Sequence, residues 1–181
     1  MPNYKKLVGE KVYLSPVSVD DWELYDKWNN DFEVINNWGG GTHISPAAAG
    51  PESLNGRAKN KNAFTIVDKA NDRVIGNCAF NYEDLENRYA TIGITIGEKE
   101  YWSKGYGSDA LRLMLDFGFN VRGHNSISLN VFEFNKRGIA CYEKVGFKRQ
   151  GVWRDCMIRG EQRYGCIYMD ILASEYFAKE L

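Results

Sequence analysis

Gly105 and Gly107 are the first residues whose type and spacing suggest chemistry, because they stand just before apolar residues with helical spacing. Backbone N–H groups at the start of a helix carry partial positive charge, and a turn without side chains lets an anion approach them. The turn therefore suits a phosphate group. A glycine pair by itself indicates no more than a structural turn, because many helices follow a glycine.

The surrounding sequence argues against two common phosphate-binding motifs. No third glycine follows at G-x-G-x-x-G spacing, and no Gly-Lys-Ser/Thr loop occurs. The segments before the turn also predict an antiparallel meander rather than a strand-helix-strand nucleotide unit. A dinucleotide-dependent oxidoreductase is therefore a distant alternative.

Asn135 and Tyr142 are a second candidate pair, on the helix predicted after the next strand. Both have structural explanations, because asparagine is a preferred N-cap residue and a tyrosine on an amphipathic helix is often part of the core. The two histidines, His43 and His124, lie far apart in the sequence, and the four cysteines form no CxxC pair. This pattern argues against a metal site and against histidine-centred catalysis.

The elements that must position these residues follow from the hydrophobic pattern. In the first half, the pattern predicts a helix that begins after Ser18 or Asp20 and continues through Trp28. It also predicts four strands, at residues 11–15, 63–67, 74–80 and 90–96. Hairpin signals join the last three strands into an antiparallel meander.

Residues 36–60 are rich in glycine and proline and predict a long mobile loop, of a length that is usually functional or disordered, with helix only briefly at 47–54. The second half predicts strand and helix in alternation. Its elements are a helix from the glycine turn to near Gly123, a strand at 127–131, a helix from Asn135 to Gly146, and two final strands at 147–152 and 164–172 joined by a turn at 159–161.

Length and composition indicate one folded domain, residues 1–181. Hydrophobic residues make up 44% and charged residues 26% of the chain, as in ordinary globular proteins. The formal charge of −1 provides no field that would attract nucleic acid or a membrane. The start of the chain turns polar before a signal core could form, and no apolar run approaches the ~18 residues of a membrane span, so we expect a cytoplasmic protein.

Residues 102–111, which contain the glycine turn, resemble the pyrophosphate-binding motif of the GCN5-related N-acetyltransferases (GNAT). Residues 135–147 resemble the same family's helix with an early Asn, a later Tyr and a final Gly-Phe. Two motifs at the family's spacing are more specific than either alone. Residues 7–14 and 28–34 are similar to the opening of the ribosomal-protein-alanine acetyltransferase branch, and only residues 39–60 match weakly.

The resemblance implies an α+β fold with a twisted, mostly antiparallel sheet of six to seven strands, helices on both faces and a splayed parallel central pair. Acetyl-CoA, as cosubstrate, would lie in the opening between residues 90–97 and 126–131. The backbone of Ile94, Thr95 and Ile96 would pair with the pantetheine arm. The pyrophosphate would be held by the turn residues Ser103, Lys104, Gly105, Tyr106, Gly107 and Ser108. A homodimer is a further expectation from the family.

The resemblance also implies roles for individual side chains. Asn135 would contact the pantetheine as well as cap its helix, and Tyr142 would place its hydroxyl near the thioester sulfur as general acid. A phenol near pKa ~10 and a thiol near ~8.5 are close enough for a hydrogen bond or proton transfer to stabilise the leaving thiolate. Lys104 would add a point charge. Trp102 stands where many relatives carry Gln or Arg, so we expect it to pack.

The general base is missing from its usual position. Many relatives carry a carboxylate on the strand before the phosphate turn, and Thr91 takes that place. Deprotonating a lysine amine at pH 7 costs roughly 4.6 kcal/mol, whereas an α-amino group near pKa 7.7 to 8 costs about 1 to 1.4 kcal/mol. The sequence therefore favours direct attack on acetyl-CoA by a protein or peptide α-amino group.

Two alternatives stay open. A polyamine or aminoglycoside acceptor would need several carboxylates at the entrance, and the hairpin expected beside it carries an acidic group, Glu83, Asp84 and Glu86. A non-catalytic acyl-CoA sensor would keep the glycines and Asn135 but would not need Tyr142. Three further side chains could shape an acceptor pocket, although packing or surface positions explain them better: Trp38, His43 and Tyr82.

Overall fold

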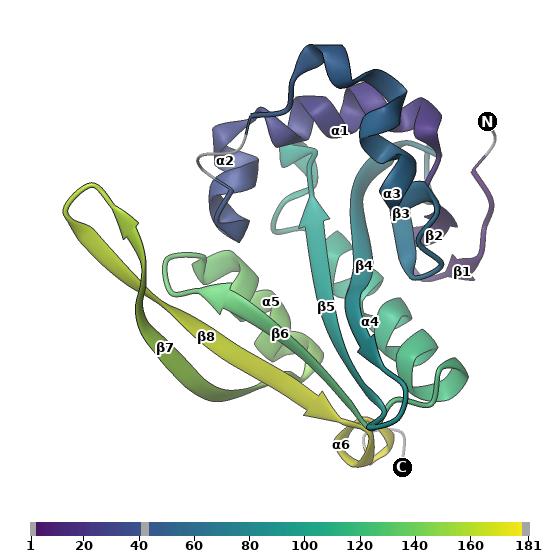
Figure 1. Ribbon diagram of the computed structural model, residues 1–181. Helices are drawn as coiled ribbons and strands as arrows, with labels where there is room; N and C mark the ends of the chain where they lie inside the picture. Colours follow the sequence, from purple (N-terminus) through teal and green to yellow (C-terminus); the bar gives the residue numbers. More distant parts are fainter. Residues whose placement is uncertain (1–2, 41–43, 179–181) are drawn as a thin grey trace.

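The computed structural model describes residues 3–40 and 44–178, and its strands form one sheet with the order β1-β2-β3-β4-β5-β6-β8-β7 (Figure 1). All neighbouring strands are antiparallel except β5 and β6, which are parallel. The strands are β1 (Leu7–Val8), β2 (Val12–Pro16), β3 (Ala63–Asp68), β4 (Val74–Asp84), β5 (Tyr89–Ile96), β6 (Ser126–Phe132), β7 (Lys148–Arg159) and β8 (Gln162–Leu172).

The sheet has eight strands, whereas the sequence predicts six to seven. The additional strand is β1, which is too short to show an alternating pattern and exists because its two residues pair with β2. The C-terminal hairpin turns at the predicted position, but β7 continues through an irregularity after Trp153. Asp155 takes a positive φ of 52° there, which lets the strand resume pairing beyond it.

The helices lie where apolar residues recur at helical spacing. They are α1 (Trp22–Asn29), α2 (Phe32–Ile35), α3 (Asn55–Ala58), α4 (Tyr106–Asp116), α5 (Lys136–Val145) and α6 (Ala173–Phe177). Ser18 caps a preceding 3₁₀ turn, η1 (Val19–Asp21), rather than α1 itself. Helix α4 continues into a π-helical turn, η5 (Phe117–Val121), which explains the predicted end near Gly123. Helix α6 has no counterpart among the predicted elements.

The region predicted as a long loop is largely made of short helical turns. Helical segments η2 (Asn36–Trp38), η3 (Ala47–Leu54) and α3 follow one another, and η3 is interrupted at Gly50, where φ is 49°. Leu54 is buried against the residues of α1 and so ties this region to the core. The brief helical segment predicted at 47–54 is confirmed as η3, whereas the turns η2 and α3 were not predicted. Glycine and proline prevent long helices but permit single turns.

The hydrophobic core occupies both faces of the sheet. On one face, Leu111 and Met114 of α4 and Ile139 of α5 pack against the central strands. On the other face, Tyr25 and Trp28 of α1 pack with residues of β2, β3 and β4. Figure 1 shows α4 and α5 behind the sheet. Because both faces are covered, every residue of β3 is buried.

Strands β5 and β6 separate after a short stretch of pairing. Their paired residues are Tyr89 with Ser126, Ala90 with Ile127, and Thr91 with Ser128. Beyond these pairs the strands diverge (Figure 1), because β5 stays with β4 as far as Ile96 while β6 follows β8 as far as Phe132. Within the described residues, the edge of β5 that faces β6 is therefore unpaired from Ile92 onward.

Candidate active site

A cleft of about 650 Å³ runs through the opening between β5 and β6. The end of β5, the turn before α4 and the helix α5 line one part of it. The segment η2, the helix α3 and the strand β4 line the other part. Helix α5 lies on one face of the sheet and α3 on the other. A molecule in the opening can therefore be reached from both sides.

The end of β5 offers main-chain groups to this cleft. Ile94, Thr95 and Ile96, which the sequence proposes for pantetheine binding, all line it, and their edge toward β6 carries no strand partner. An extended arm that contains amides can pair with such an edge as another strand would. The indole Nε1 of Trp102 donates to the carbonyl of Ile96 at 2.7 Å, which holds the following turn against the strand.

The turn before α4 has the backbone geometry of an anion site. Ser103 and Gly105 have positive φ angles of 59° and 88°, and Gly105 is the N-cap of α4. The first N–H groups of the helix have no intrahelical partner and point toward the helix N-terminus, where the dipole favours an anion. Ser103, Gly105, Gly107 and Ser108 line the cleft. The Ser108 hydroxyl lies 3.3 Å from the Cys141 sulfur, so these two side chains connect α4 to α5.

Lys104 and Tyr106 do not line the cleft. The Lys104 side chain is exposed, and the Tyr106 ring packs edge-on against Tyr101 with 4.9 Å between centroids. Lys11 lies 5.4 Å from the centre of the Tyr106 ring and donates to the Lys104 carbonyl at 3.0 Å. At Lys104 and Tyr106 the side chains do not line the cleft, so their main-chain groups would contact a phosphate bound there.

Asp109 anchors this turn, although the sequence did not single it out for that purpose. Its buried carboxylate accepts hydrogen bonds from the backbone N–H groups of Lys11 (2.8 Å) and Val12 (3.0 Å). The contact fixes the first turn of α4 to the start of β2. A Cβ on Gly9 would lie 2.5 Å from the Asp109 carboxylate, so the approach also depends on a glycine. In the sequence, Asp109 is a carboxylate in the first turn of a helix. A favourable interaction with the helix dipole explains such a residue without any distant partner.

Tyr142 presents a phenol to the cleft. Its ring contacts Phe147 edge-on at 6.1 Å, and its side chain lines the cavity. Burial raises the pKa of the Tyr142 hydroxyl well above its usual value, so the group stays protonated at physiological pH. Within the described part of the chain this hydroxyl has no hydrogen-bond partner, which leaves it available to a bound molecule.

Asn135 caps α5, as its structural explanation predicts. Its Oδ1 accepts from the Gly138 N–H at 2.9 Å, and its Nδ2 donates to the Asn37 carbonyl at 3.3 Å. The residue also lines the cleft. Since an amide nitrogen carries two hydrogens, one remains for a further acceptor.

Arg137 lines the cleft and was missed in the sequence. Its guanidinium stacks on the Trp102 ring at 3.5 Å from the centroid, which joins the two sequence motifs across the opening. Burial lowers the pKa of Arg137. A cation in the first turn of α5 interacts unfavourably with the helix dipole. This unfavourable position could have identified Arg137 in the sequence as a residue with a role in the cleft.

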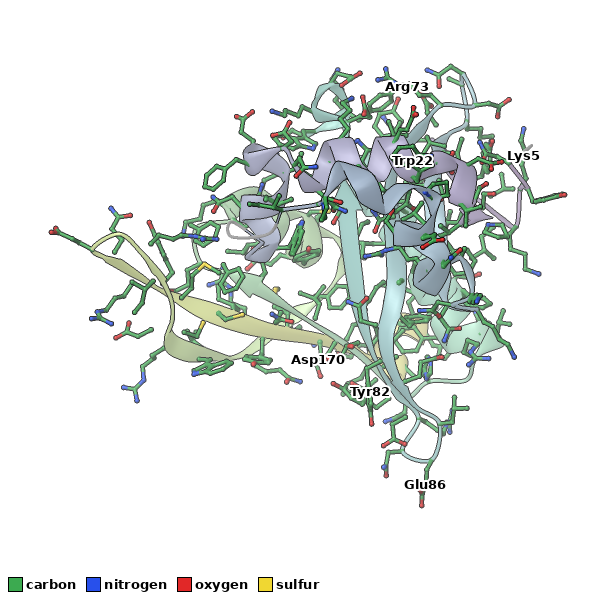
Figure 2. The ribbon with its side chains drawn as sticks, turned by 45° about the horizontal axis from the view of Figure 1, so that its top comes forward. Lys5, Trp22, Arg73, Tyr82, Glu86 and Asp170 are labelled. Carbon is green, nitrogen blue, oxygen red and sulfur yellow. The ribbon has the colours of Figure 1, made fainter. Side chains whose placement is uncertain are left out.

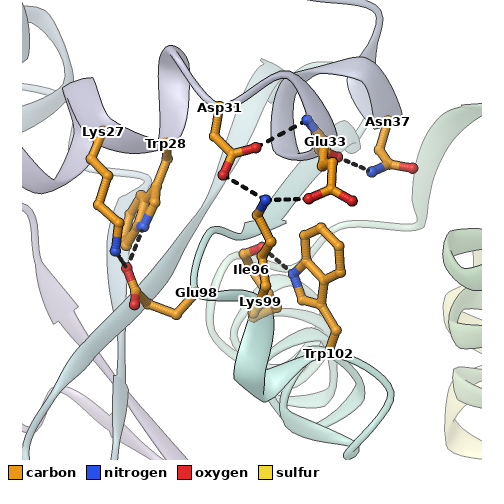
Figure 3. A network of polar contacts seen from close by, with 9 residues as sticks. All are labelled: Lys27, Trp28, Asp31, Glu33, Asn37, Ile96, Glu98, Lys99 and Trp102. Atoms are coloured by element: carbon orange, nitrogen blue, oxygen red, sulfur yellow. Dashed lines mark hydrogen bonds and ion pairs between the residues drawn. The ribbon is translucent and has the colours of Figure 1, made fainter.

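A polar network ties the two sides of the cleft together (Figure 3). The Glu98 side chain is only 2% exposed and accepts from Lys27 at 2.7 Å and from the Trp28 indole at 2.8 Å. Burial alone raises the pKa of Glu98, but the hydrogen bonds from Lys27 and Trp28 and the nearby positive charges outweigh burial, so the pKa is lowered. Lys99 pairs with Asp31 at 2.8 Å and also with Glu33. Helices α1 and α2 are thus held to the segment that leads into the phosphate turn.

The acidic group of the β4–β5 hairpin does not reach the cleft. Glu83 accepts hydrogen bonds from Arg122 (3.0 Å) and from His124 (2.9 Å). Burial raises the pKa of Glu83, but these partners outweigh it and lower the pKa. Asp84 closes the hairpin by accepting from the Asn87 N–H at 2.9 Å. Figure 2 shows Glu86 at the outer tip of the hairpin, at the opposite end of the molecule from Arg73. None of residues 82–91 lines the cleft.

The other side chains considered for the acceptor site or the general base differ in whether they line the cleft. Trp38 lines the cleft together with Val34, whereas Tyr82 is exposed on the hairpin and Thr91 lies below the opening. His43 lies outside the described residues. Among the described residues that line the cleft there is no Asp, Glu or His.

These features fit one kind of ligand. The unpaired edge of β5 suits an amide-containing arm, the open turn at the α4 N-terminus suits a pyrophosphate, and the Tyr142 phenol suits a group that leaves with negative charge. Together they match the parts of an acyl-CoA thioester. The fold and the site therefore define an acyl-CoA-dependent transferase.

Comparison with known proteins narrows this class. The acetyltransferase (GNAT) domain family matches residues 11–148. The N-acetyltransferase p20 of Bacillus licheniformis, named as uncharacterized, is 36% identical over 125 residues, which cover 68% of this chain and 67% of that protein. The N-acetyltransferase YnaD of Bacillus subtilis strain 168, also named as uncharacterized, is 24% identical over 170 residues, 94% of this chain and 98% of that protein. The chain belongs to the acetyltransferase (GNAT) domain family and is an acetyl-CoA-dependent N-acetyltransferase.

Solved structures share the fold at low identity. A GNAT-family acetyltransferase from Bacillus anthracis matches with a TM-score of 0.81 at 21% identity, over 93% of this chain and 99% of that chain. The spermidine N-acetyltransferase of Vibrio cholerae, solved in complex with CoA and spermine, matches with a TM-score of 0.80 at 20% identity, over 92% of this chain and 98% of that chain. The predicted GNAT fold is confirmed. None of these relatives is named for the ribosomal-protein-alanine branch, so that part of the resemblance stays a prediction.

None of the helices in residues 3–40 and 44–178 is long and apolar enough to cross a membrane. The same residues contain no group of three or more His, Cys, Asp or Glu side chains placed to hold a metal ion.

Proposed function

We propose that the protein transfers acetyl from acetyl-CoA to the α-amino group of a protein or peptide, by direct attack in a ternary complex. One observation carries this proposal: the described lining of the cleft includes the Tyr142 hydroxyl but no carboxylate and no imidazole. A site with an acid and no base suits an amine that is already partly neutral near pH 7 to 8. An α-amino group meets that condition and a lysine side chain does not.

The bond changes need a hydrogen-bond donor for the leaving sulfur and an acceptor for the proton of the amine. The acceptor nitrogen forms the new C–N bond, the C–S bond breaks, and the sulfur leaves as a thiolate. Tyr142 donates a hydrogen bond to that sulfur. Because burial raises the pKa of Tyr142 above that of a thiol, the phenol stabilises the departing charge mainly as a hydrogen-bond donor. The proton of the attacking amine passes to water.

Main-chain groups hold the cosubstrate in this proposal. Ile94, Thr95 and Ile96 pair with the pantetheine, and the turn from Ser103 to Ser108 holds the pyrophosphate through backbone N–H groups. The free hydrogen on the Asn135 amide and the position of Arg137 support contacts from α5 as well. Acetyl-CoA supplies the activated thioester, and the chain orients it.

A polyamine acceptor is the second candidate, because a solved structure with the same fold is titled a spermidine N-acetyltransferase. The site of this chain argues for a different acceptor. The acidic residues that would bind a polycation lie on the hairpin, where Glu83 is paired with Arg122, and the described part of the cleft carries Arg57, Arg137 and Lys144 instead. The substrate panel described next therefore includes a polyamine as the alternative acceptor.

The test is CoA release from acetyl-CoA with a panel of Ala- and Ser-starting peptides, spermidine, lysine and an aminoglycoside. We expect turnover with the α-amino peptides. Tyr142→Phe should bind acetyl-CoA normally and lose roughly 10²- to 10⁴-fold in kcat. Tyr168→Phe is the matched control, because Tyr168 is 42% exposed on β8 and does not line the cleft.

The pH profile separates a base-free site from one with a protein base. Without a protein base, kcat/KM should rise with pH until it levels near the acceptor's own pKa, about 8 for an α-amine and about 10.4 for a lysine amine. A break at one pH for every acceptor would contradict the proposal. Unchanged kcat in Tyr142→Phe would remove Tyr142 as the acid, and acetyl-CoA binding without turnover of any amine would favour a sensor.

A further inference from the structure

The part of the cleft lined by α3 and β4 lies apart from the phosphate turn, and we call it the acceptor end because the proposed cosubstrate would fill the other part. It is rich in hydrogen-bond donors. Arg57 of α3 and Asn77 and Asn81 of β4 line it, on the face of the sheet covered by α1 and α3. The Arg57 Nη1 donates to the Asn77 Oδ1 at 3.1 Å. This bond orients the amide so that its NH₂ group is free to donate elsewhere. Asn81 adds a second amide to this lining, and it packs closely over Gly93 of β5, where a Cβ would lie 2.5 Å from the Asn81 Nδ2.

Arg57 has no acidic partner among the described residues, in contrast to three other arginines of the chain. Arg73, Arg122 and Arg149 each pair with a carboxylate. Within the described residues, Arg57 has no carboxylate within 4 Å, and its bond to Asn77 uses one of five N–H donors. The remaining donors form a planar fork that matches a carboxylate in a bidentate geometry.

The charge of the whole cleft also favours an acceptor that carries a carboxylate. Its described lining contains three cationic side chains, Arg57, Arg137 and Lys144, and no acidic one. Arg137 and Lys144 belong to α5, on the side of the phosphate turn, whereas Arg57 lies on the acceptor side. A positive group there repels a polycation and attracts an acceptor that carries negative charge.

We propose that the acceptor carries a carboxylate about one residue away from its reactive amine, and that Arg57, supported by Asn77, binds this carboxylate. The inference rests on the proposed function, since it names the class of amine that the same site acetylates. Two sources share this chemistry: a peptide with Asp or Glu as its second residue, and a free amino acid with a carboxylate in its side chain.

The strand spacing sets the distance between the two groups. Asn77 lies opposite Thr95 on β5, and the opening lies on the other side of β5. For a thioester held in the opening level with Thr95, one to two strand spacings of about 4.8 Å put the bound carboxylate roughly 5 to 10 Å from the point of attack. The side chain of a peptide's second residue reaches this range, because successive Cα atoms are about 3.8 Å apart. The α-carboxylate of a free amino acid lies only roughly 3 Å from its amine and is too close.

The experiment compares kcat/KM for peptides that begin Ala-Glu, Ala-Gln, Ala-Asp and Ala-Asn, together with free glutamate, free alanine and spermidine. We expect the wild-type protein to prefer the acidic member of each peptide pair by roughly 10- to 100-fold, the range of a charge-assisted bidentate contact. Arg57→Gln should bring that ratio close to one, and Arg57→Lys should keep part of it. Arg163→Gln is the matched control, because Arg163 is an exposed arginine on β8 that does not line the cleft.

The outcomes separate this inference from the proposed function. The affinity for acetyl-CoA, measured by calorimetry, shows that each variant keeps its cosubstrate site. Turnover of α-amino peptides without an acidic preference would overturn the inference and leave the proposed function intact. A preference that survives in Arg57→Gln would also overturn it. Turnover of spermidine alone would overturn both. An Arg57-dependent preference for free glutamate over alanine would support the carboxylate site and identify the free amino acid as its source.

Discussion

Replacing Gly107 with alanine should separate the stability of the fold from the affinity for acetyl-CoA. Gly107 lies in the first turn of α4 and lines the cleft. A Cβ there would lie 3.7 Å from the Ile96 Cγ1 and 3.8 Å from the Cys141 sulfur, which are ordinary contacts. The protein itself therefore has room for a methyl group, and only a ligand that approaches the backbone would meet it.

The two effects have opposite signs. Alanine is favoured over glycine inside a helix by about 0.5 to 1 kcal/mol, so the unliganded variant should unfold about 1 to 4 °C higher than the wild type. The methyl group should weaken a charge-assisted hydrogen bond from the turn to the pyrophosphate, which contributes about 1.5 to 3 kcal/mol. The dissociation constant for acetyl-CoA should then rise roughly 10- to 150-fold.

Gly105→Ala provides the contrast, because Gly105 has a φ of 88°. A side chain at such a dihedral costs about 1 to 2 kcal/mol, so this variant should lose both stability and affinity. Gly151→Ala on β7 is the control for a glycine replaced in open space, since a Cβ there meets no atom within 4 Å and the residue does not line the cleft.

The assays are calorimetric unfolding without ligand and titration with acetyl-CoA at 25 °C. The reasoning is refuted if Gly107→Ala binds acetyl-CoA as tightly as the wild type, because the turn would then not approach the phosphates. A variant that unfolds well below the wild type would refute the claim that the protein has room at this position.

Two further predictions concern the network and packing beside the turn. Glu98→Gln should lower the free energy of unfolding by about 1 to 3 kcal/mol at pH 7, through weaker contacts with Lys27 and Arg73. Because the folded-state pKa of Glu98 is lowered, this difference in the free energy of unfolding should be present above pH 4.5 and shrink as the pH falls below it. Urea unfolding at pH 7 and pH 4 would check it, and an equal difference at both pH values would contradict the pairing. Gly97→Ala would place a Cβ 2.1 Å from the Trp28 ring and should cost about 1 to 3 kcal/mol in the same assay, and wild-type stability would contradict that packing.

Features that act through the local backbone could be predicted from the sequence. The strands of the meander, the helices α4 and α5, the Asn135 cap and the glycine turn all depend on periodicity or on dihedral preferences within a few residues. In the region between α2 and β3 the segment η3 was predicted, but the single turns η2 and α3 were not, because single turns lack a period and depend on contacts with the core. The edge strand β1 likewise exists only through its partner β2.

Contacts between distant residues explain what the sequence left open in the site. Asp109 bonds to Lys11, which is 98 positions away, and Arg137 stacks on Trp102 from a different helix. Glu83, one of the acidic residues that kept a polyamine acceptor open, is already paired with Arg122. Neither the partners nor the consequences of these contacts follow from residue types.

The sequence by itself determined the family, the glycine turn at the start of α4 and the place of Tyr142 on α5, because motifs with local spacing encode them. Only the tertiary structure decided the character of the acceptor end. Arg57 and Asn77 come from separate elements, and the charge that an acceptor meets depends on which carboxylates are already paired elsewhere. That balance is set by the fold, since Coulomb energies depend on distance and burial rather than on order along the chain.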